Sequence, residues 1–244
     1  MHMFFVEPRQ IVGGQITITG PDVNHIRNVL RMKPGEMVRV SDEKDFCGQC
    51  RVEELLEDQI LLTILEEADS TELPAQVTLF QGLPKGDKME WIIQKNTELG
   101  IARIVPVVMK RSVVKLDAKK AATKVARWQA IAESAGKQSG RTKLPEVAPV
   151  MTYAQALKEA ADYDLLLLPY ESAEGMDAVR SLFAQAAPGM RIGILIGPEG
   201  GFEPSEVEAA VAAGWKVLSL GRRILRTETA GMTVMANLML QLEP

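Results

Sequence analysis

From about residue 76 onward, short apolar runs alternate with longer segments that have the periodicity of amphipathic helices. This alternation is typical of a parallel sheet that helices cover on both faces. We expect strands at 77–81, 104–108, 165–168, 192–196 and 217–220, and helices at 88–99, 118–135, from Thr152 onward, at 204–214 and at 228–242. The sequence therefore predicts an α/β fold with a parallel sheet, which binds ligands at the carboxyl ends of its strands.

The first 70 residues follow a different pattern. The runs that indicate strands are 16–19, 37–40 and 59–65, and one short helix is expected at 22–32. A polar stretch at 66–74 is typical of a linker. We therefore predict two domains, a small β-rich one over residues 1–70 and the α/β domain over residues 74–244.

The composition is that of a globular protein, with 46% hydrophobic and 25% charged residues in a chain of 244. No apolar run approaches the roughly 20 residues that a membrane span requires. The start of the chain lacks a basic segment followed by a long apolar one, so it does not read as a secretion signal. We expect a cytoplasmic protein with no membrane partner.

The chain has two cysteines, Cys47 and Cys50, in a single C-x-x-C pattern. Such a pair occurs in redox sites and as half of a zinc site. No other cysteine is available, and the only histidines, His2 and His25, lie too far apart in the sequence to form the closely spaced second pair of such a site. We therefore expect no metal.

Positive charge is concentrated in one segment. Residues 110–143 hold ten basic and two acidic side chains, a local charge of +8, on a chain whose net charge is −4. A local positive field of this kind suits a phosphate-binding face, and an ordinary solvated helix produces the same pattern. Charge alone leaves contact with RNA or DNA and a plain helix surface equally open.

Two glycine-bearing segments follow expected strands. The first, 196–202, reads Ile-Gly-Pro-Glu-Gly-Gly-Phe, and its glycines allow main-chain N–H groups to approach a ligand closely. It lacks the spacing of a dinucleotide fingerprint and the lysine of a P-loop. A simple tight turn between strand and helix has the same composition, so this loop alone does not decide between a site and a turn.

The second segment, 220–230, carries Arg222, Arg223 and Arg226 within five residues. Helix capping accounts for its threonines, since such residues favour the first turn of a helix. Capping does not account for three arginines, which are suited to binding a phosphate or polarising a base carbonyl. A third segment, 132–141, is polar and glycine-punctuated after a basic helix, and it reads as a loop.

At this point several motifs match one family. Besides 196–202, 220–230 and 133–141, they are 85–90, 95–100, Arg111-Ser112, His25 with 29–31, and the turn 33–35. Together they closely resemble the bacterial RsmE family, the 16S rRNA uridine-N3 methyltransferases of the SPOUT superfamily. The resemblance extends over nearly the whole chain.

The resemblance implies a SPOUT-type α/β knot, in which the C-terminal part of the parallel sheet domain forms a deep trefoil knot, and a PUA-like β-barrel at the N-terminus. It further implies S-adenosylmethionine as the cofactor, a homodimer, and the 16S rRNA of the small ribosomal subunit as the partner. The implied cofactor loops are 168–171, 196–201 and 220–230. Their expected binding residues are Leu168, Pro169, Tyr170, Ile196, Gly197, Pro198, Glu199, Gly200, Gly201, Leu220, Gly221, Ile224, Leu225, Arg226, Thr229 and Ala230.

Methyl transfer to uridine N3 requires removal of the N3 proton and stabilisation of charge on O2 and O4. We expect Arg226 to stabilise charge and Glu199 or Glu228 to act as the base. Two other readings stay open, since Glu199 also suits holding its loop and Glu228 also suits a helix N-terminus. The expected RNA contacts are His25, Arg27, Arg31, Arg111, Lys115, Lys119, Lys120, Lys124, Arg127, Arg141, Arg222 and Arg223.

Three other functions remain compatible with the residues. The first is a methyltransferase of the same fold that acts on another RNA position. The second is a small-molecule enzyme that uses the pocket without RNA, which the +8 segment disfavours. The third is an RNA-binding or ribosome-assembly factor without catalysis.

Overall fold

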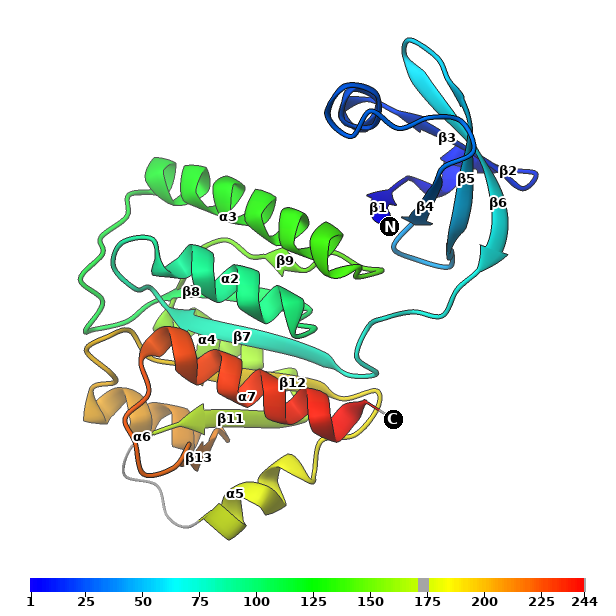
Figure 1. Ribbon diagram of the computed structural model, residues 1–244. Helices are drawn as coiled ribbons and strands as arrows, with labels where there is room; N and C mark the ends of the chain where they lie inside the picture. Colours follow the sequence, from blue (N-terminus) through cyan, green and yellow to red (C-terminus); the bar gives the residue numbers. More distant parts are fainter. Residues whose placement is uncertain (171–175, 244) are drawn as a thin grey trace. The chain divides into compact units, whose positions relative to one another are not determined.

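The computed structural model describes residues 1–170 and 176–243. These residues divide into two compact units (Figure 1). The first consists of Met1–Glu72 with Gly136–Leu144, and the second of Leu73–Ala135 with the chain from Pro145 onward. Each unit has its own sheet and its own buried core, so each is described by itself.

The first unit is built on a sheet of six strands. These are β1 (His2–Phe5), β2 (Ile11–Val12), β3 (Gln15–Thr19), β4 (Met37–Ser41), β5 (Cys47–Leu55) and β6 (Gln59–Glu67). Their order is β1-β4-β5-β6-β3-β2, with β1 parallel to β4 and the other pairs antiparallel. Alternate residues such as Val38, Val40, Ile60 and Leu62 point into the core. The expected strands are present, and β6 continues two residues into the stretch that reads as a linker.

The expected helix at 22–32 is only partly regular. A short helix α1 (Pro21–Asn24) continues as a π-helical turn over His25–Val29, and Arg31 then has a left-handed backbone with φ of 53°. Val23 and Ile26 still face the core as their spacing predicts. A residue with positive φ cannot continue a right-handed helix, which explains why the helix ends before residue 32. A 3-10 turn, Pro8–Gln10, precedes β2.

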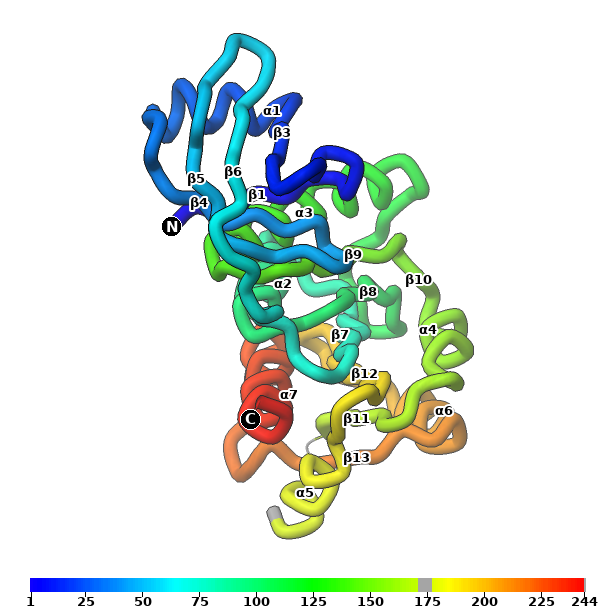
Figure 2. Tube along the Cα trace, turned by 90° about the vertical axis from the view of Figure 1, so that its right-hand side faces the viewer, coloured from blue at the N-terminus to red at the C-terminus, as the bar shows by residue number. Residues whose placement is uncertain are grey.

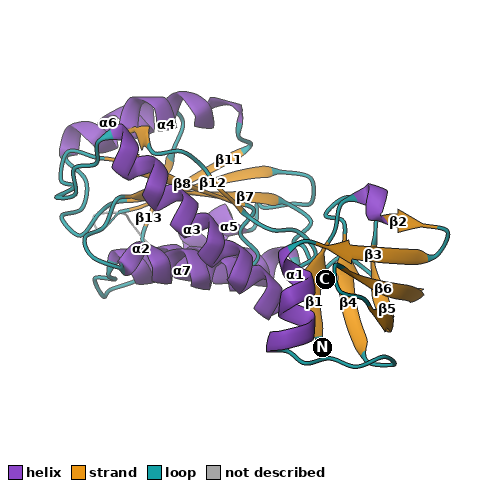
Figure 3. Ribbon diagram, turned by 90° about the horizontal axis from the view of Figure 1, so that it is seen from above, coloured by secondary structure: helices purple, strands orange, loops and turns teal. Residues whose placement is uncertain are grey.

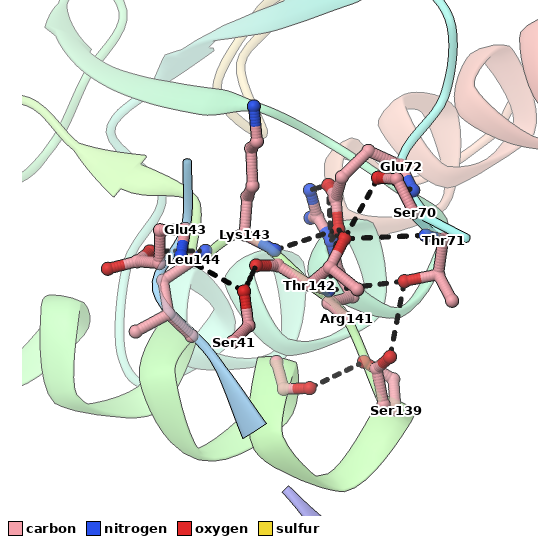
Figure 4. A network of polar contacts seen from close by, with 12 residues as sticks. Ser41, Glu43, Ser70, Thr71, Glu72, Ser139, Arg141, Thr142, Lys143 and Leu144 are labelled. Atoms are coloured by element: carbon pink, nitrogen blue, oxygen red, sulfur yellow. Dashed lines mark hydrogen bonds and ion pairs between the residues drawn. The ribbon is translucent and has the colours of Figure 1, made fainter. Parts of the chain in front are cut away.

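Residues 136–144 belong to the first unit through a polar network (Figure 4). The Glu72 carboxylate accepts hydrogen bonds from the Arg141 guanidinium and from the backbone N–H groups of Thr142 and Lys143, at 2.9 and 3.0 Å for the latter two. Ser41 Oγ donates to the Thr142 carbonyl at 2.7 Å. These contacts hold residues 141–143 against Ser41 and Glu72, which lie much earlier in the chain.

The segment 132–141, which reads as a loop, is mostly helical. Helix α3 runs over Ala118–Ser139 and ends near Gly140, whose φ is 72°. Its last turns contain glycine and serine, which are weak helix formers. Contacts within the first unit stabilise this end, since Lys137 Nζ lies 3.1 Å from Asp22 Oδ1. Tertiary contacts of this kind override local propensity.

The second unit is built on a parallel sheet. Its strands are β7 (Gln76–Gly82), β8 (Arg103–Val108), β9 (Glu146–Val147), β10 (Met151–Thr152), β11 (Leu165–Pro169), β12 (Arg191–Ile196) and β13 (Lys216–Leu218). The order is β10-β8-β7-β12-β11-β13, with β9 beside β8, and every pair is parallel. The α/β prediction is confirmed, and β13 is shorter than the expected 217–220.

Helices cover both faces of this sheet (Figures 2 and 3). They are α2 (Lys88–Glu98), α3, α4 (Tyr153–Glu159), α5 (Met176–Phe183), α6 (Pro204–Ala212) and α7 (Thr227–Leu242), and a 3-10 turn (Ala160–Asp162) follows α4. One core layer joins the sheet to α2, α3, α5 and α7, and the other joins it to α4 and α6. As expected, Thr152 caps α4 in a capping box with Gln155.

The cysteines of the C-x-x-C pattern lie on β5, and both are free thiols. Cys50 is fully buried, and burial together with the nearby Cys47 raises the pKa of its thiol to about 11. Within the described ranges, no group of three or more His, Cys, Asp or Glu side chains is arranged to hold a metal ion. None of the helices described has the length and apolar character to cross a membrane.

Candidate functional site

Three loops meet at the carboxyl ends of β12, β11 and β13, which are neighbours in the sheet. They surround a cavity of about 910 Å³. Its walls are Pro169 and Tyr170, residues 196–202, residues 219–227 and Ala230, with Lys88 and Arg111 from two further segments. The two glycine-bearing segments that the sequence singled out therefore line one cavity.

All the expected cofactor-binding residues of 196–201 lie on this wall. In the other two loops, all but two of the expected residues do. Leu168 is fully buried in the sheet, and Thr229 lies in the first turn of α7 outside the wall. Glu171, the end of the first expected loop, lies outside the described residues. Most of the residues that the resemblance implied for the cofactor therefore line the cavity.

The 197–201 loop is held tightly. Gly201 has a φ of 67°, and its N–H donates to the Pro198 carbonyl at 2.9 Å, which closes a turn. A Cβ on Gly82, at the end of β7, would lie 2.6 Å from the Pro198 nitrogen. Only glycine permits this approach of two backbones. The loop is therefore a packed turn, with its glycines required by geometry.

A buried chain of hydrogen bonds ties this loop to α7. Gln81 Nε2 donates to Thr227 Oγ1 at 2.9 Å, and the Thr227 hydroxyl donates to the Gly197 carbonyl at 2.6 Å. Gln81 is fully buried and Thr227 nearly so. Neither role was predicted from the sequence. The available signal was a glutamine at the end of an apolar strand, where a buried polar side chain needs a partner.

Lys88, the first residue of α2, is also a cavity residue that the sequence analysis did not select. Its Nζ lies 2.9 Å from Glu199 Oε1 and 3.8 Å from Glu228 Oε2. Burial alone raises the pKa of the Glu199 carboxyl, and hydrogen bonds from Lys88 and from backbone N–H groups, including that of Lys85, outweigh it. The net effect is a lowered pKa. Glu199 is therefore held as a carboxylate.

The arginines of the 220–230 segment remain accessible. Arg222, Arg223 and Arg226 are exposed, and the side chain of Arg226 keeps 82% of its accessible surface. Arg226 Nη1 lies 4.0 Å from Glu228 Oε1. This end of the cavity can offer guanidinium groups to an incoming anion or carbonyl.

Arg111 makes hydrogen bonds that stabilise the glycine loop beside the cavity. Its Nε donates to Glu203 Oε1 at 2.8 Å and its Nη1 to the Gly200 carbonyl at 2.9 Å. A Cβ on Gly200 would lie 3.0 Å from the Arg111 Cβ. The expected role of Arg111 was contact with RNA, and its observed partners make it a support of the glycine loop as well.

The other basic residues fall into two groups. Those on or just before α3 are mostly exposed: Lys115, Lys119, Lys120 and Arg127. Arg127 pairs with Glu90, Lys120 with Asp117, and Lys124 lies over the Trp128 ring. In the first unit, His25 and Arg31 are exposed, and Arg27 donates to the Glu57 carbonyl.

Arg141 does not fit its expected role. Only 5% of the residue is exposed, and its guanidinium is paired with Glu72 inside the first unit. A guanidinium buried in an ion pair is not available to bind a phosphate. The expectation that Arg141 contacts RNA is corrected, because its positive charge neutralises Glu72.

Comparisons with known proteins match these features. A family model described as an RNA methyltransferase domain matches residues 71–239, and one described as an RNA methyltransferase PUA domain matches residues 18–65. The chain is 39% identical over 231 residues to the ribosomal RNA small subunit methyltransferase E of Bacillus subtilis (strain 168), covering 93% of this chain and 90% of that protein. These matches confirm the resemblance and the PUA-like N-terminal module.

Solved structures are also similar. The crystal structure of a ribosomal RNA small subunit methyltransferase E from Neisseria gonorrhoeae bound to S-adenosyl methionine has a TM-score of 0.82 and 35% identity, covering 97% of this chain and 96% of that one. A crystal structure of a hypothetical protein has a TM-score of 0.93 and 38% identity, covering 99% and 98% of the two chains.

Proposed function

Because the chain belongs to the ribosomal RNA small subunit methyltransferase E family, we propose that it transfers a methyl group from S-adenosylmethionine to N3 of a uridine in 16S rRNA. The observation that carries this proposal is that described residues at the carboxyl ends of three neighbouring strands line a common cavity. The natural substrate would then be the small ribosomal subunit or its rRNA, and the proposed location is the cytoplasm.

The cavity suits S-adenosylmethionine in size and in chemistry. Its volume of about 910 Å³ lies in the range of small-molecule sites, roughly 300–1,000 Å³. The wall combines apolar side chains such as Ile196, Leu220 and Leu225 with the backbone of a glycine loop, which suits a ligand that has both apolar and polar parts. The residues proposed to hold the cofactor are the expected ones on the wall: Pro169, Tyr170, residues 196–201, Leu220, Gly221, Ile224, Leu225, Arg226 and Ala230.

S-adenosylmethionine supplies an electrophilic methyl group on a sulfonium when it is bound. The protein must then take the N3 proton, because the N3–H bond breaks as the new N–C bond forms. We assign the base to Glu228, whose side chain is 22% exposed. Glu199 is the weaker candidate because its carboxylate already has Lys88 as a close partner and a lowered pKa.

Arg226 is assigned the stabilisation of charge that develops on O2 or O4 of the uracil ring. Its exposed guanidinium lies 4.0 Å from Glu228 Oε1, so the base and the charge stabiliser both come from the start of α7. Arg222 and Arg223 are assigned to RNA phosphates. N3 lies on the Watson–Crick edge, so the target uridine must be unpaired or turned out of its stack.

RNA affinity is proposed to come from exposed and half-buried basic residues of both units. They are His25, Arg27 and Arg31 in the module at 1–70, and Arg111, Lys115, Lys119, Lys120, Lys124 and Arg127 in the domain at 74–244. Charge reversal at Lys120 and Lys124 should reduce the slope of log affinity against log salt by about one to two. An unchanged slope would show that these residues of α3 do not contact RNA phosphates.

A homodimer and a knot are the remaining parts of the proposal. Helix α7 packs on α2, and next to its buried stripe it leaves Leu240 with 77% of its surface exposed, as α2 leaves Trp91 with 61%. Exposed apolar residues on adjoining helices suit contact with a second copy. The trefoil knot has support in the path of the chain, which passes from the edge strand β13 to α7 beside β12. Sedimentation would test the dimer, and an experimental trace through 168–230 would test the knot.

The decisive experiment incubates the protein with small ribosomal subunits and labelled S-adenosylmethionine, followed by nuclease digestion and mass spectrometry. The expected product is one labelled 3-methyluridine in 16S rRNA. Label on another atom or in another RNA would show that the proposed target is wrong. In calorimetry, Gly200→Arg should abolish cofactor binding because its side chain collides with Arg111, and Lys120→Ala should leave it unchanged.

A further inference from the structure

Lys88 reaches the cavity from outside the three loops. It is the first residue of α2, and its ammonium lies between two carboxylates, 2.9 Å from Glu199 Oε1 and 3.8 Å from Glu228 Oε2. The three side chains are 30%, 24% and 22% exposed. Partial burial of all three groups strengthens their interaction relative to a surface pair.

We propose that Lys88 is a positioning residue that couples the two halves of the site, fixing the 196–201 loop through Glu199 and orienting the proposed base through Glu228. This inference rests on the proposed function, since it assigns donor binding to the first carboxylate and proton transfer to the second. Lys88 itself contacts neither the uridine nor the cofactor in this scheme.

The contacts of Glu199 support the first half of the coupling. Its carboxylate accepts a hydrogen bond from the Lys85 backbone N–H at 3.1 Å in addition to the Lys88 ion pair. The segment 85–88 therefore holds Glu199 from two sides. Glu199 lies in the centre of the glycine loop, so a displacement of its side chain moves the backbone on which donor binding depends.

The contacts of Glu228 support the second half. Its Oε2 is buried and has no hydrogen-bond partner among the described residues, and Lys88 is the cation beside it. Its Oε1 lies 4.0 Å from Arg226. A buried carboxylate oxygen without a hydrogen bond is costly unless a charge compensates it. Lys88 supplies that charge.

Other charged groups surround this trio. They are Lys85 and Asp87 on the segment before α2, Arg226 at the start of α7, and Arg111, Arg222 and Arg223 on the cavity wall. Among the ion pairs of the described chain, Lys88 is the cation that contacts both Glu199 and Glu228. Removal of its charge should therefore affect both carboxylates, and the surrounding arginines should not compensate.

The test compares Lys88→Met with Lys88→Arg and with the matched control Lys95→Met. Lys95 lies two turns further along α2 and pairs with Glu98. In Lys88→Met, the cofactor dissociation constant from calorimetry should rise by about tenfold or more, and kcat at saturating cofactor should fall by about tenfold or more. Lys88→Arg should recover most of both losses, and Lys95→Met should change neither.

A second readout does not depend on RNA. Carbon-13 NMR of the glutamate carboxyls should show the Glu199 pKa rise toward its ordinary value in Lys88→Met and stay unchanged in Lys95→Met. Combined variants complete the test. Glu199→Gln added to Lys88→Met should weaken cofactor binding no further, and Glu228→Gln added to it should lower kcat less than it does in the wild type.

The outcomes separate the two proposals. If rRNA is not methylated but the Glu199 titration and cofactor binding respond to Lys88, the proposed function is wrong and the Lys88–Glu199 half of the coupling stands. If methylation occurs and Lys88→Met changes neither binding nor kcat, or if the combined variants are strictly additive, the inference is overturned. Should Lys88→Met fail to fold, Lys88→Gln undergoes the same measurements.

Discussion

The two loops that face each other across the cavity differ in how they are held. In the 197–201 loop, Gly197 and Pro198 are buried, and the loop is fastened by Thr227, Lys88 and Arg111. In the 222–226 loop, Ile224 is 79% exposed and the Arg226 side chain 82% exposed. One side of the site is thus fixed by its own structure, and the other side presents charged and apolar groups to whatever arrives.

This difference suits the two ligands of a methyl transfer. A small donor binds well to a pocket that is already formed, because little ordering is required on binding. An RNA acceptor must be captured from solution and positioned, for which long exposed arginines are appropriate. We therefore expect substitutions in the first loop to affect donor affinity and substitutions in the second to affect turnover.

The largest effect should follow Arg226→Ala. If this side chain stabilises charge on the uracil, kcat should fall by about 100- to 1,000-fold, as for loss of an oxyanion donor. The cofactor dissociation constant should change less than about threefold, since that factor is under 1 kcal/mol. Single-turnover kinetics with calorimetry measures both. An equal loss of donor binding and of turnover would contradict the assignment of donor affinity to the first loop and turnover to the second.

The next effect should follow Gly82→Ala. The new Cβ would lie 2.6 Å from the Pro198 nitrogen, so the fixed loop must move. Overpacking of this kind costs about 1–3 kcal/mol, which corresponds to roughly a 5- to 150-fold loss of donor affinity if it falls on the bound state. Calorimetry measures it, and Gly231→Ala is the control, because its Cβ would meet only ordinary contacts, the nearest at 3.5 Å. Unchanged affinity would mean that the loop is not preformed.

The third variant, Thr227→Val, tests stability and not donor affinity. The substitution keeps the shape of the side chain and removes the hydroxyl that joins Gln81 to the Gly197 carbonyl. Leaving buried polar groups without partners costs about 1–3 kcal/mol of stability. Thermal unfolding should show this loss, and Thr227→Ser should retain most of the stability. If the valine variant is as stable as the wild type, these hydrogen bonds do not stabilise the loop.

The smallest effect concerns pH. The folded state lowers the pKa of Glu199 below its ordinary value of 4.5, so its contribution to stability is fully present above that value. It is lost as the pH falls through the lower folded pKa. The difference in thermal stability between the wild type and Glu199→Gln, measured from pH 6 downward, should therefore become smaller in acid. A difference that does not change with pH would contradict the pairing of Glu199 with Lys88.

The sequence was informative wherever a local pattern sufficed. The order of strands and helices, the capping of α4 by Thr152 and the two glycine segments followed from periodicity and residue type, because these signals act over a few residues. The helical end of α3 did not follow, since its glycine and serine are weak helix formers. Contacts such as Lys137 with Asp22, far apart in the sequence, determine that end.

Arg141 shows the same limit at a functional level. It stands in a basic segment beside a glycine, where an RNA contact is a reasonable prediction. Its partner Glu72 lies 69 positions earlier, and no local pattern connects the two. Gln81 was missed for a related reason: a glutamine in an apolar strand signals a buried partner but does not identify Thr227 as that partner.

The sequence by itself determined the α/β fold, the family and the segments that surround the cavity, because periodicity, glycine and short motifs are local properties of a chain. Only the tertiary structure decided which charges are available and which are neutralised. It buried Arg141 against Glu72, left Arg226 exposed, and placed Lys88 between Glu199 and Glu228. The physical reason is that the environment of a charge depends on groups brought close by folding, and not on its neighbours in sequence.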